Sequence, residues 1–189
     1  MARSQLKIWF VSSNENKRKE IQQIVATANV EILAAPLRIA ELQFDDIREV
    51  VHRKTLEAFS QIQRPLLVEH TALYLTSLNG FPGGQTQHFW DCLGPNKFSE
   101  MFGGSQVCAK SVLGYCDGRR VHIFQGEVKG LVAKTPSLNT EFQWDSIFIP
   151  TEPRDYGIPF ADLGDEKHKI SMRRKALNEF CRHLKRPIE

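Results

Sequence analysis

Residues 66–71 are Leu66-Leu67-Val68-Glu69-His70-Thr71. Three apolar residues followed by polar ones predict a short buried strand from Leu66 to His70. The end of a buried strand holds side chains rigidly, and here it carries a carboxylate, Glu69, next to an imidazole, His70. Such a pair is able to bind a metal ion or to move a proton. The alternative for an isolated Glu-His pair is a strand end that merely meets solvent.

A turn-rich segment follows this strand. It runs Asn79-Gly80-Phe81-Pro82-Gly83-Gly84, and proline with repeated glycine disrupts both helices and strand ladders. We therefore predict a loop over residues 79–84. The mostly polar segment that continues to Phe102 contains several aromatic residues and is predicted to form short helices.

Strands and helices alternate in the chain before residue 66. Strands are expected at Leu6–Val11 and Val30–Ala34, and helices at Lys17–Ala28 and over the residues from Ile47 to Ile62. The apolar residues of both helices recur at helical spacing. Asp45 or Asp46 is expected to cap the second helix, because a carboxylate accepts hydrogen bonds from the free N–H groups of a helix start.

The second half of the chain is rich in predicted strands. Val107–Tyr115 and Val121–Phe124 flank an Asp117-Gly118 turn as a hairpin, Gly126–Ala133 continues the sheet, and Phe142–Ile149 adds an apolar segment. Ser171–Leu184 predicts a final amphipathic helix. The whole pattern indicates the α/β class, with a central mixed β-sheet flanked by helices. No repeat or linker interrupts residues 1–189, which predicts one domain.

Composition restricts the function classes. The 189 residues carry a net charge of +3, which is too small to imply a nucleic-acid partner. No apolar stretch reaches transmembrane length and no secretory signal is recognisable, so no membrane association is expected. The cysteines are scattered without a zinc-type spacing, and reduced thiols in a cytoplasmic protein are expected. They are Cys92, Cys108, Cys116 and Cys181.

Basic residues gather near the C-terminus, between Lys167 and Arg186. This asymmetry suits an anionic ligand, and the solvated face of a terminal helix is the alternative. An arginine binds phosphate bidentately and a lysine approaches it as a compact charge, so Lys167 and Arg173 are candidate phosphate contacts. A weaker hypothesis is that this segment binds nucleic acid, which predicts an affinity that falls steeply with salt.

The polar segment between the first strand and the first helix is a candidate phosphate site. A helix start offers free N–H groups and the positive end of the helix dipole. Ser12, Asn14 and Lys17 add a hydroxyl, an amide and an ammonium group. The segment lacks the glycines of a P-loop, so a capped helix start is the alternative.

Two glutamates and one aromatic segment complete the candidates. We place Glu41 and Glu69 around a divalent cation, because Mg²⁺ prefers carboxylates, water and phosphate oxygens. Phe142, Trp144 and Asp145 combine aromatic faces with an acceptor, which suits stacking on a base and recognising its edge. Aromatic residues in an apolar run are also commonly part of a core.

Taken together, these segments resemble the inosine/xanthosine triphosphate pyrophosphatase family, whose members remove deaminated purine nucleotides. The resemblance covers nearly the whole chain and keeps the family order of motifs. The matching segments are Ser12-x-Asn14-x-x-Lys17, Glu41-x-Gln43, Val68-Glu69-His70-Thr71-x-Leu73, Gly80-x-Pro82-Gly83, Phe142-Gln143-Trp144-Asp145, Phe160-Ala161-Asp162-Leu163 and Ser171-Met172-Arg173.

The resemblance implies a single elongated ITPase-like domain that forms a homodimer. It implies hydrolysis of a nucleoside triphosphate to the monophosphate and pyrophosphate, with Mg²⁺ or Mn²⁺ as the cofactor. Glu41 and Glu69 would organise the cation, and Glu69 and His70 would be catalytic. The nucleotide would be bound by Ser12, Asn14, Lys17, Phe142, Trp144, Asp145, Lys167, Met172 and Arg173.

The chain departs from the family pattern at functional positions. His70 stands in place of an aspartate that serves as metal ligand or base. A neutral imidazole is a poor ligand for Mg²⁺, but it is able to act as a general base, since free imidazole has a pKa of about 6.5. Met172 replaces a histidine that contacts the substrate, and it donates no hydrogen bond to a purine carbonyl, so base discrimination is expected to weaken or shift. Gln143 replaces a glycine, and Gln87 stands where a basic residue is usual.

These departures leave a second hypothesis open. His70 is either a substitute base or a sign that hydrolysis has been lost. In the second case the chain would be a nucleotide-binding protein with a sensing or partner role, and a turnover assay with a panel of nucleotides would separate the two.

Overall fold

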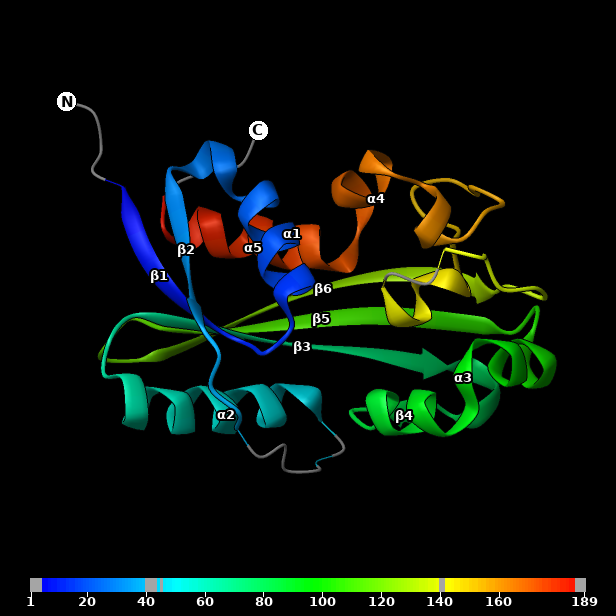
Figure 1. The fold of residues 1–189 in the computed structure, drawn as a ribbon, viewed down its shortest axis with the longest axis horizontal. Coiled ribbons are helices and arrows are strands. Elements are labelled where there is room, and N and C mark those ends of the chain that lie inside the picture. Colours follow the sequence, from blue (N-terminus) through cyan, green and yellow to red (C-terminus); the bar gives the residue numbers. More distant parts are fainter. Residues whose placement is uncertain (1–4, 40–43, 45, 140–141, 186–189) are drawn as a thin grey trace. The chain divides into compact units, whose positions relative to one another are not determined.

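The computed structural model describes residues 5–39, 44, 46–139 and 142–185, and Figure 1 shows the path of the chain. The strands are β1 (Leu6–Val11), β2 (Val30–Ala35), β3 (Leu66–Leu75), β4 (Pro82–Gly83), β5 (Gln106–Cys116), β6 (Val121–Val132) and β7 (Phe148–Pro150). The α-helices are α1 (Glu15–Ile24), α2 (Ile47–Ile62), α3 (Thr86–Phe102), α4 (Asp165–Ile170) and α5 (Met172–His183). Short 3-10 helices are η1 (Ala26–Ala28), η2 (Thr76–Leu78), η3 (Gln143–Ser146) and η4 (Phe160–Asp162).

The strands form one mixed sheet. Over the described residues it has seven strands in the order β2-β1-β3-β5-β6-β7, with β4 paired to β3. β1 is parallel to both β2 and β3, whereas β3 with β4 and β6 with β7 are antiparallel. The predicted α/β class with a mixed sheet flanked by helices is therefore confirmed.

The chain divides into two compact units. The first contains Met1–His70, Ser111–Gly126 and Arg173–Glu189, and the second contains Thr71–Lys110 and Glu127–Met172. The organisation of residues 1–189 as one domain stays a prediction.

In the first unit, helices cover both faces of the strands. Figure 1 shows α2 on one face and α1 with α5 on the other. Alternation along β1 follows from this arrangement: Ile8 and Phe10 pack with α1 and α5, whereas Val11 packs with Ala58 of α2. Strands covered on both faces are apolar on both faces, which explains why the stretch beginning at Leu66 was recognisable as buried.

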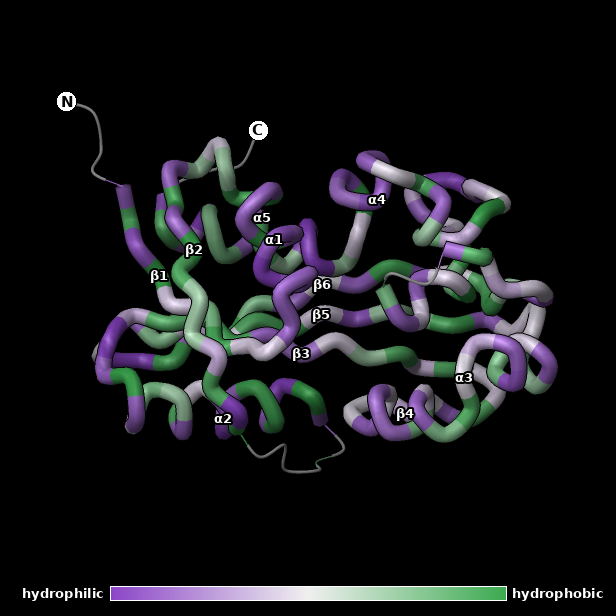
Figure 2. The backbone as a smooth tube through the Cα atoms, in the orientation of Figure 1, coloured by the Kyte–Doolittle hydropathy of each residue, from purple (hydrophilic) through white to green (hydrophobic). Residues whose placement is uncertain are grey.

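Helix α2 lies very close to β5. Hydrophobic and hydrophilic residues alternate along this helix (Figure 2), as expected for a helix with one buried face. It crosses β5 at Gly114, where an added Cβ would lie 2.1 Å from Oγ1 of Thr55. The sheet therefore needs a residue without a side chain at this point.

The second unit has its own aromatic core. Leu73 of β3, Phe98 of α3, Phe148 of β7 and Phe160 of η4 are all fully or almost fully buried in one cluster. Helix α3 is kinked at Gly94, which has a left-handed φ of 64° and is followed by Pro95. The prediction of short helices up to Phe102 agrees with this break.

Most element bounds agree with the predictions. The expected helix over Lys17–Ala28 is found as α1 followed by η1, and the final helix is α5. Asp46 caps α2, since its Oδ1 accepts a hydrogen bond from the Arg48 N–H at 2.8 Å. Asp45, the other candidate cap, lies outside the described residues. No helix within the described ranges is both long and apolar enough to cross a membrane.

Two expectations about the strands were wrong, and two others were refined. β3 does not end at His70 but continues to Leu75, because Leu73 and Leu75 alternate into the core of the second unit. Pro82 and Gly83 lie in a two-residue strand within the predicted loop, where a short edge tolerates a proline. β6 runs without a break from Val121 to Val132, and the expected apolar segment over residues 142–149 divides into η3 (Gln143–Ser146) and the start of β7 (Phe148–Pro150).

Candidate active site

Glu69 and His70 lie in the interior of β3 and not at its end. Successive side chains of a strand point to opposite faces. Glu69 shares the face of Leu67, which packs with α1 and α5, whereas His70 shares the face of Leu66 and Val68, which pack with α2. The two side chains are both buried, but the strand directs them apart.

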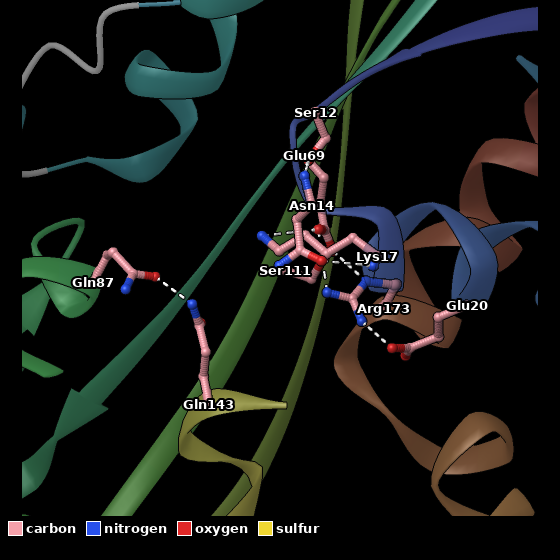
Figure 3. Close-up of polar contacts among 9 residues, drawn as sticks. All are labelled: Ser12, Asn14, Lys17, Glu20, Glu69, Gln87, Ser111, Gln143 and Arg173. Atoms are coloured by element: carbon pink, nitrogen blue, oxygen red, sulfur yellow. Dashed lines mark hydrogen bonds and ion pairs between the residues drawn. The ribbon is translucent and has the colours of Figure 1, made fainter. Parts of the chain in front are cut away.

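The Glu69 carboxylate is the centre of a buried polar cluster in the first unit (Figure 3). Its Oε1 accepts a hydrogen bond from Oγ of Ser111 at 2.9 Å and from Nε of Arg173 at 2.5 Å. Its Oε2 accepts one from a terminal guanidinium nitrogen of Arg173 at 3.2 Å and lies 3.3 Å from Nζ of Lys17. A carboxylate offers about four acceptor positions, so the described neighbours use all of them. We call Glu69, Ser111, Lys17, Arg173 and Glu20 the Glu69 cluster.

Glu20 balances the charge of this cluster. Its carboxylate lies 2.5 Å from the Arg173 guanidinium, and both side chains are almost completely buried. Two cations and two carboxylates therefore meet with no net charge. Removing either partner of such a buried pair leaves a charge without compensation, so these side chains fix one another in place.

The electrostatics of the Glu69 cluster follow from this arrangement. Burial alone would raise the pKa of Glu69, but the charges of Arg173 and Lys17 and the hydrogen bonds from Arg173 and Ser111 outweigh it and lower the pKa to about 2. For Lys17, burial is the largest influence and lowers the pKa below its ordinary value, against the attraction of Glu69. Glu69 is thus ionised at neutral pH.

The predicted phosphate segment begins α1. Asn14 is the N-cap of this helix, and its Oδ1 accepts a hydrogen bond from the Lys17 N–H at 3.1 Å. The Asn14 N–H in turn donates to Oγ of Ser12 at 3.1 Å. A capped helix start was the alternative to a phosphate site in the sequence, and the structure shows this cap. Phosphate binding by Ser12, Asn14 and Lys17 stays a prediction. The Lys17 ammonium forms an ion pair with Glu69, which links the start of α1 to the Glu69 carboxylate.

The described side chains do not form a magnesium site by themselves. All four acceptor positions of Glu69 are used by Ser111, Lys17 and Arg173. His70 offers nitrogen, which Mg²⁺ binds poorly, and it points to the other face of β3. No group of three His, Cys, Asp or Glu side chains suited to a metal ion occurs within the described ranges. Glu41, the other predicted ligand, lies outside the described residues.

A second cluster, in the second unit, contains the predicted base contacts. Oδ2 of Asp145 lies 2.5 Å from Nζ of Lys167, and this ammonium also lies 4.2 Å from the centre of the Phe142 ring, a cation–π distance. We call Asp145, Lys167 and Phe142 the Asp145 cluster. It places an acceptor, a cation and an aromatic face together, which is the chemistry that recognition of a base requires.

Two predicted substrate contacts belong to the core instead. Trp144 is 4% exposed and Met172 is 1% exposed, and both pack in the aromatic core of the second unit. Trp144 also makes an edge contact with Phe148 at 6.0 Å between ring centres. A direct contact with a nucleotide stays a prediction for both.

Two members of the Glu69 cluster were not predicted. Glu20 follows Lys17 by three residues, so helical spacing already placed both on the same side of α1. Ser111 offered no signal, because it meets Glu69 only through the pairing of β3 with β5.

The comparisons agree with the fold and with the order of these segments. The model of the Ham1 family matches residues 8–183. The chain belongs to the Ham1 family, which confirms the resemblance found in the sequence.

Relatives of similar length carry the names of nucleotide pyrophosphatases. The dITP/XTP pyrophosphatase of Methanopyrus kandleri is 34% identical, over 97% of this chain and 98% of its own. Inosine triphosphate pyrophosphatase 2 of Trypanosoma cruzi is 35% identical, over 94% of this chain and 92% of its own. The structure of a HAM1 protein from Coxiella burnetii has a TM-score of 0.79 at 22% identity, over 95% of this chain and 98% of that one, which shows that the fold is shared.

Proposed function

We propose that this protein hydrolyses nucleoside triphosphates, with deaminated purine nucleotides as its substrates, to the monophosphate and pyrophosphate. The observation that supports this most strongly is full-length similarity to relatives named dITP/XTP pyrophosphatase and inosine triphosphate pyrophosphatase. The two clusters supply chemistry that such a reaction uses, namely cations for phosphate and an acceptor beside an aromatic face for a base.

In this proposal Lys17 is the phosphate contact of the Glu69 cluster. Its side chain is 17% exposed, whereas that of Arg173 is completely buried. Arg173 therefore acts by holding Glu69 in place, and Ser12 and Asn14 act by fixing the start of α1. Phosphate at a helix start is further favoured by the helix dipole.

The proposal includes a divalent cation, Mg²⁺ or Mn²⁺, which would neutralise the phosphates of the bound nucleotide. Phosphate oxygens and water satisfy most of the coordination that Mg²⁺ requires, so the protein needs to add few ligands. Glu41 is the proposed additional ligand. The homodimer and the cytoplasmic location stay predictions.

His70 is the proposed general base because it holds the position of the family's catalytic aspartate. Since its side chain lies on the face of β3 opposite to Glu69 and Lys17, the proposal requires the attacking water to lie on the α2 side of this strand. Water attacks the α-phosphorus, a bond forms between them, the bond from this phosphorus to the bridging oxygen breaks, and pyrophosphate leaves. The proton of the attacking water passes to a ring nitrogen of His70, which accepts it as a general base.

The experiment is a turnover assay on wild type, His70→Ala and His70→Asp, with inosine, xanthosine, guanosine and adenosine triphosphates. His70→Ala is expected to lower kcat by about 10²- to 10⁴-fold with a small change in KM. His70→Asp is expected to keep activity, because a carboxylate is also able to accept the proton of the attacking water.

His52→Ala is the matched control, because His52 is a histidine of α2 without a role in the proposal. If the wild type binds nucleotides without turnover and His70→Asp gains it, the protein is a nucleotide-binding member that has lost hydrolysis, and the proposed function is wrong.

A further inference from the structure

Three polar side chains of the second unit form a hydrogen-bonded chain beside the Asp145 cluster. Nε2 of Gln143 donates to Oε1 of Gln87 at 2.7 Å, a contact drawn in Figure 3. Nε2 of Gln87 donates in turn to Oδ1 of Asp91, one helical turn further along α3, also at 2.7 Å. We call Asp91, Gln87 and Gln143 the amide relay.

The carboxylate end of the relay fixes the orientation of both amides. An ionised carboxylate only accepts hydrogen bonds, whereas an amide has one end that accepts and one that donates. Asp91 therefore requires the NH₂ group of Gln87, which turns the Gln87 oxygen toward Gln143. That oxygen requires the NH₂ group of Gln143. The relay leaves the Gln143 oxygen and its second N–H for another partner.

The backbone of Gln143 adopts an unusual conformation at the end of the amide relay. Gln143 has a φ of 42°, in the left-handed region that is uncommon for residues other than glycine. It lies between Phe142 and Trp144 in the turn that also carries Asp145. Gln87 thus anchors, from a separate helix, the residue at which this turn adopts its unusual conformation.

We propose that Gln143 is a specificity-determining residue for the base, and that Gln87 and Asp91 are positioning residues that fix which end of its amide the base meets. The proposal rests on the proposed function. Its substrate class is a purine with a 6-oxo group and an N1–H, because the fixed oxygen accepts from N1–H and the remaining N–H donates to the oxo group. A 6-aminopurine presents the opposite polarity, a lone pair at N1 and an amino donor. A 6-aminopurine would therefore bind less well as long as Gln87 and Asp91 fix the orientation of the Gln143 amide.

Asp91→Asn tests the direction of the relay with almost no change of shape. An asparagine presents either an oxygen or an NH₂ group, so it no longer dictates how Gln87 and Gln143 are turned. The ratio of kcat/KM for inosine triphosphate to that for adenosine triphosphate is expected to fall about five- to tenfold, which corresponds to one hydrogen bond. Gln143→Gly is expected to lower this ratio to a similar extent.

Glu100→Gln is the matched control, since it makes the same charge change on an exposed residue of the same helix. Its ratio is expected to equal that of the wild type. Thermal unfolding of each variant shows whether it is folded, and a merely structural role would change kcat for both nucleotides equally and leave their ratio unchanged.

Dissociation constants for the same two nucleotides, measured by calorimetry without turnover, separate this inference from the proposed function. If the wild type hydrolyses neither nucleotide but its binding ratio falls in Asp91→Asn, the function is wrong and the inference holds. If the wild type turns over nucleotide and neither ratio changes in Asp91→Asn and Gln143→Gly, the inference is overturned and the function holds. Absence of both binding and turnover overturns both.

Discussion

The Glu69 cluster and the Asp145 cluster each contain a buried carboxylate next to a cation, but they are built differently. Glu69 is carried by a central strand and is held by a serine, a lysine and a bidentate arginine, which Glu20 balances in turn. Asp145 is carried by a short 3-10 helix and faces Lys167, whose ammonium also lies on the Phe142 ring. The second carboxylate has one charged partner and an aromatic ring beside that cation, whereas two cations and a hydroxyl contact the first.

This difference separates two tasks. Charges that compensate one another in a buried site fix geometry, because moving any one of them exposes the others. An amide relay and an aromatic face cost less to rearrange and discriminate between ligands by hydrogen-bond polarity. The first cluster is therefore expected to dominate stability and the second to dominate selectivity, and the following predictions test that division.

The largest effect is expected from Arg173→Met. This change keeps the bulk of the side chain but leaves the buried carboxylates of Glu69 and Glu20 without their shared cation, so unfolding free energy should fall by about 3–5 kcal/mol. Urea unfolding at pH 7 measures it. Arg182→Met, on the exposed side of the same helix, should change stability by less than about 0.5 kcal/mol. Equal losses in the two variants would contradict the account.

A smaller loss is expected from Lys167→Met. Asp145 loses a charged partner, and removal of a hydrogen bond to a charged group costs about 1.5–3 kcal/mol. The Lys167 side chain is 10% exposed, whereas that of Arg173 is fully buried, so this loss should stay below that of Arg173→Met under the same urea conditions. A loss that exceeds it would reverse the comparison between the clusters.

Acid should weaken the Glu69 cluster in a defined window. The folded-state pKa of Glu69 is about 2, below its ordinary value of 4.5, so ionised Glu69 contributes stability that is fully present above pH 4.5. This contribution is lost as the pH falls from 4.5 toward 2. The difference in unfolding free energy between wild type and Glu69→Gln should therefore narrow over that range. A constant difference from pH 6 to pH 3 would show that Glu69 is not the titrating group.

The smallest effect on stability is expected from Gln87→Ala. Gln87 is exposed, and surface substitutions of this kind usually change stability by less than about 0.5 kcal/mol. The melting temperature should hardly move, whereas the ratio of kcat/KM between 6-oxo and 6-amino purine nucleotides should fall. A large drop in melting temperature with an unchanged ratio would assign the relay to stability alone.

The sequence predicted the parts of the fold that depend on local pattern. The apolar runs at Leu6 and Leu66 and the helical spacing from Ile47 are recognisable because each is repeated over neighbouring residues. The end of β3 was missed because Glu69-His70-Thr71 looks like the polar boundary of a strand. Glu69 is buried there because Lys17, Ser111 and Arg173 meet its carboxylate.

The site was predictable only in its residue types. The motif order identified Lys17, Glu69, Asp145 and Arg173 as functional candidates, but Glu69 and Arg173 are 104 residues apart, and only the fold shows that they bind one another. The opposite directions of Glu69 and His70 follow from strand periodicity. That periodicity was already available from the predicted strand Leu66–His70, which contains both residues.

A nucleoside triphosphate pyrophosphatase is recognised by its products, because it cleaves the triphosphate next to the α-phosphorus. The most direct test is phosphorus NMR of inosine triphosphate incubated with the purified wild-type protein and Mg²⁺, with His70→Ala in parallel. Inosine monophosphate and pyrophosphate should appear in equal amounts with the wild type and about 10²- to 10⁴-fold more slowly with His70→Ala. Unchanged triphosphate, or release of orthophosphate with inosine diphosphate, would contradict the proposed function.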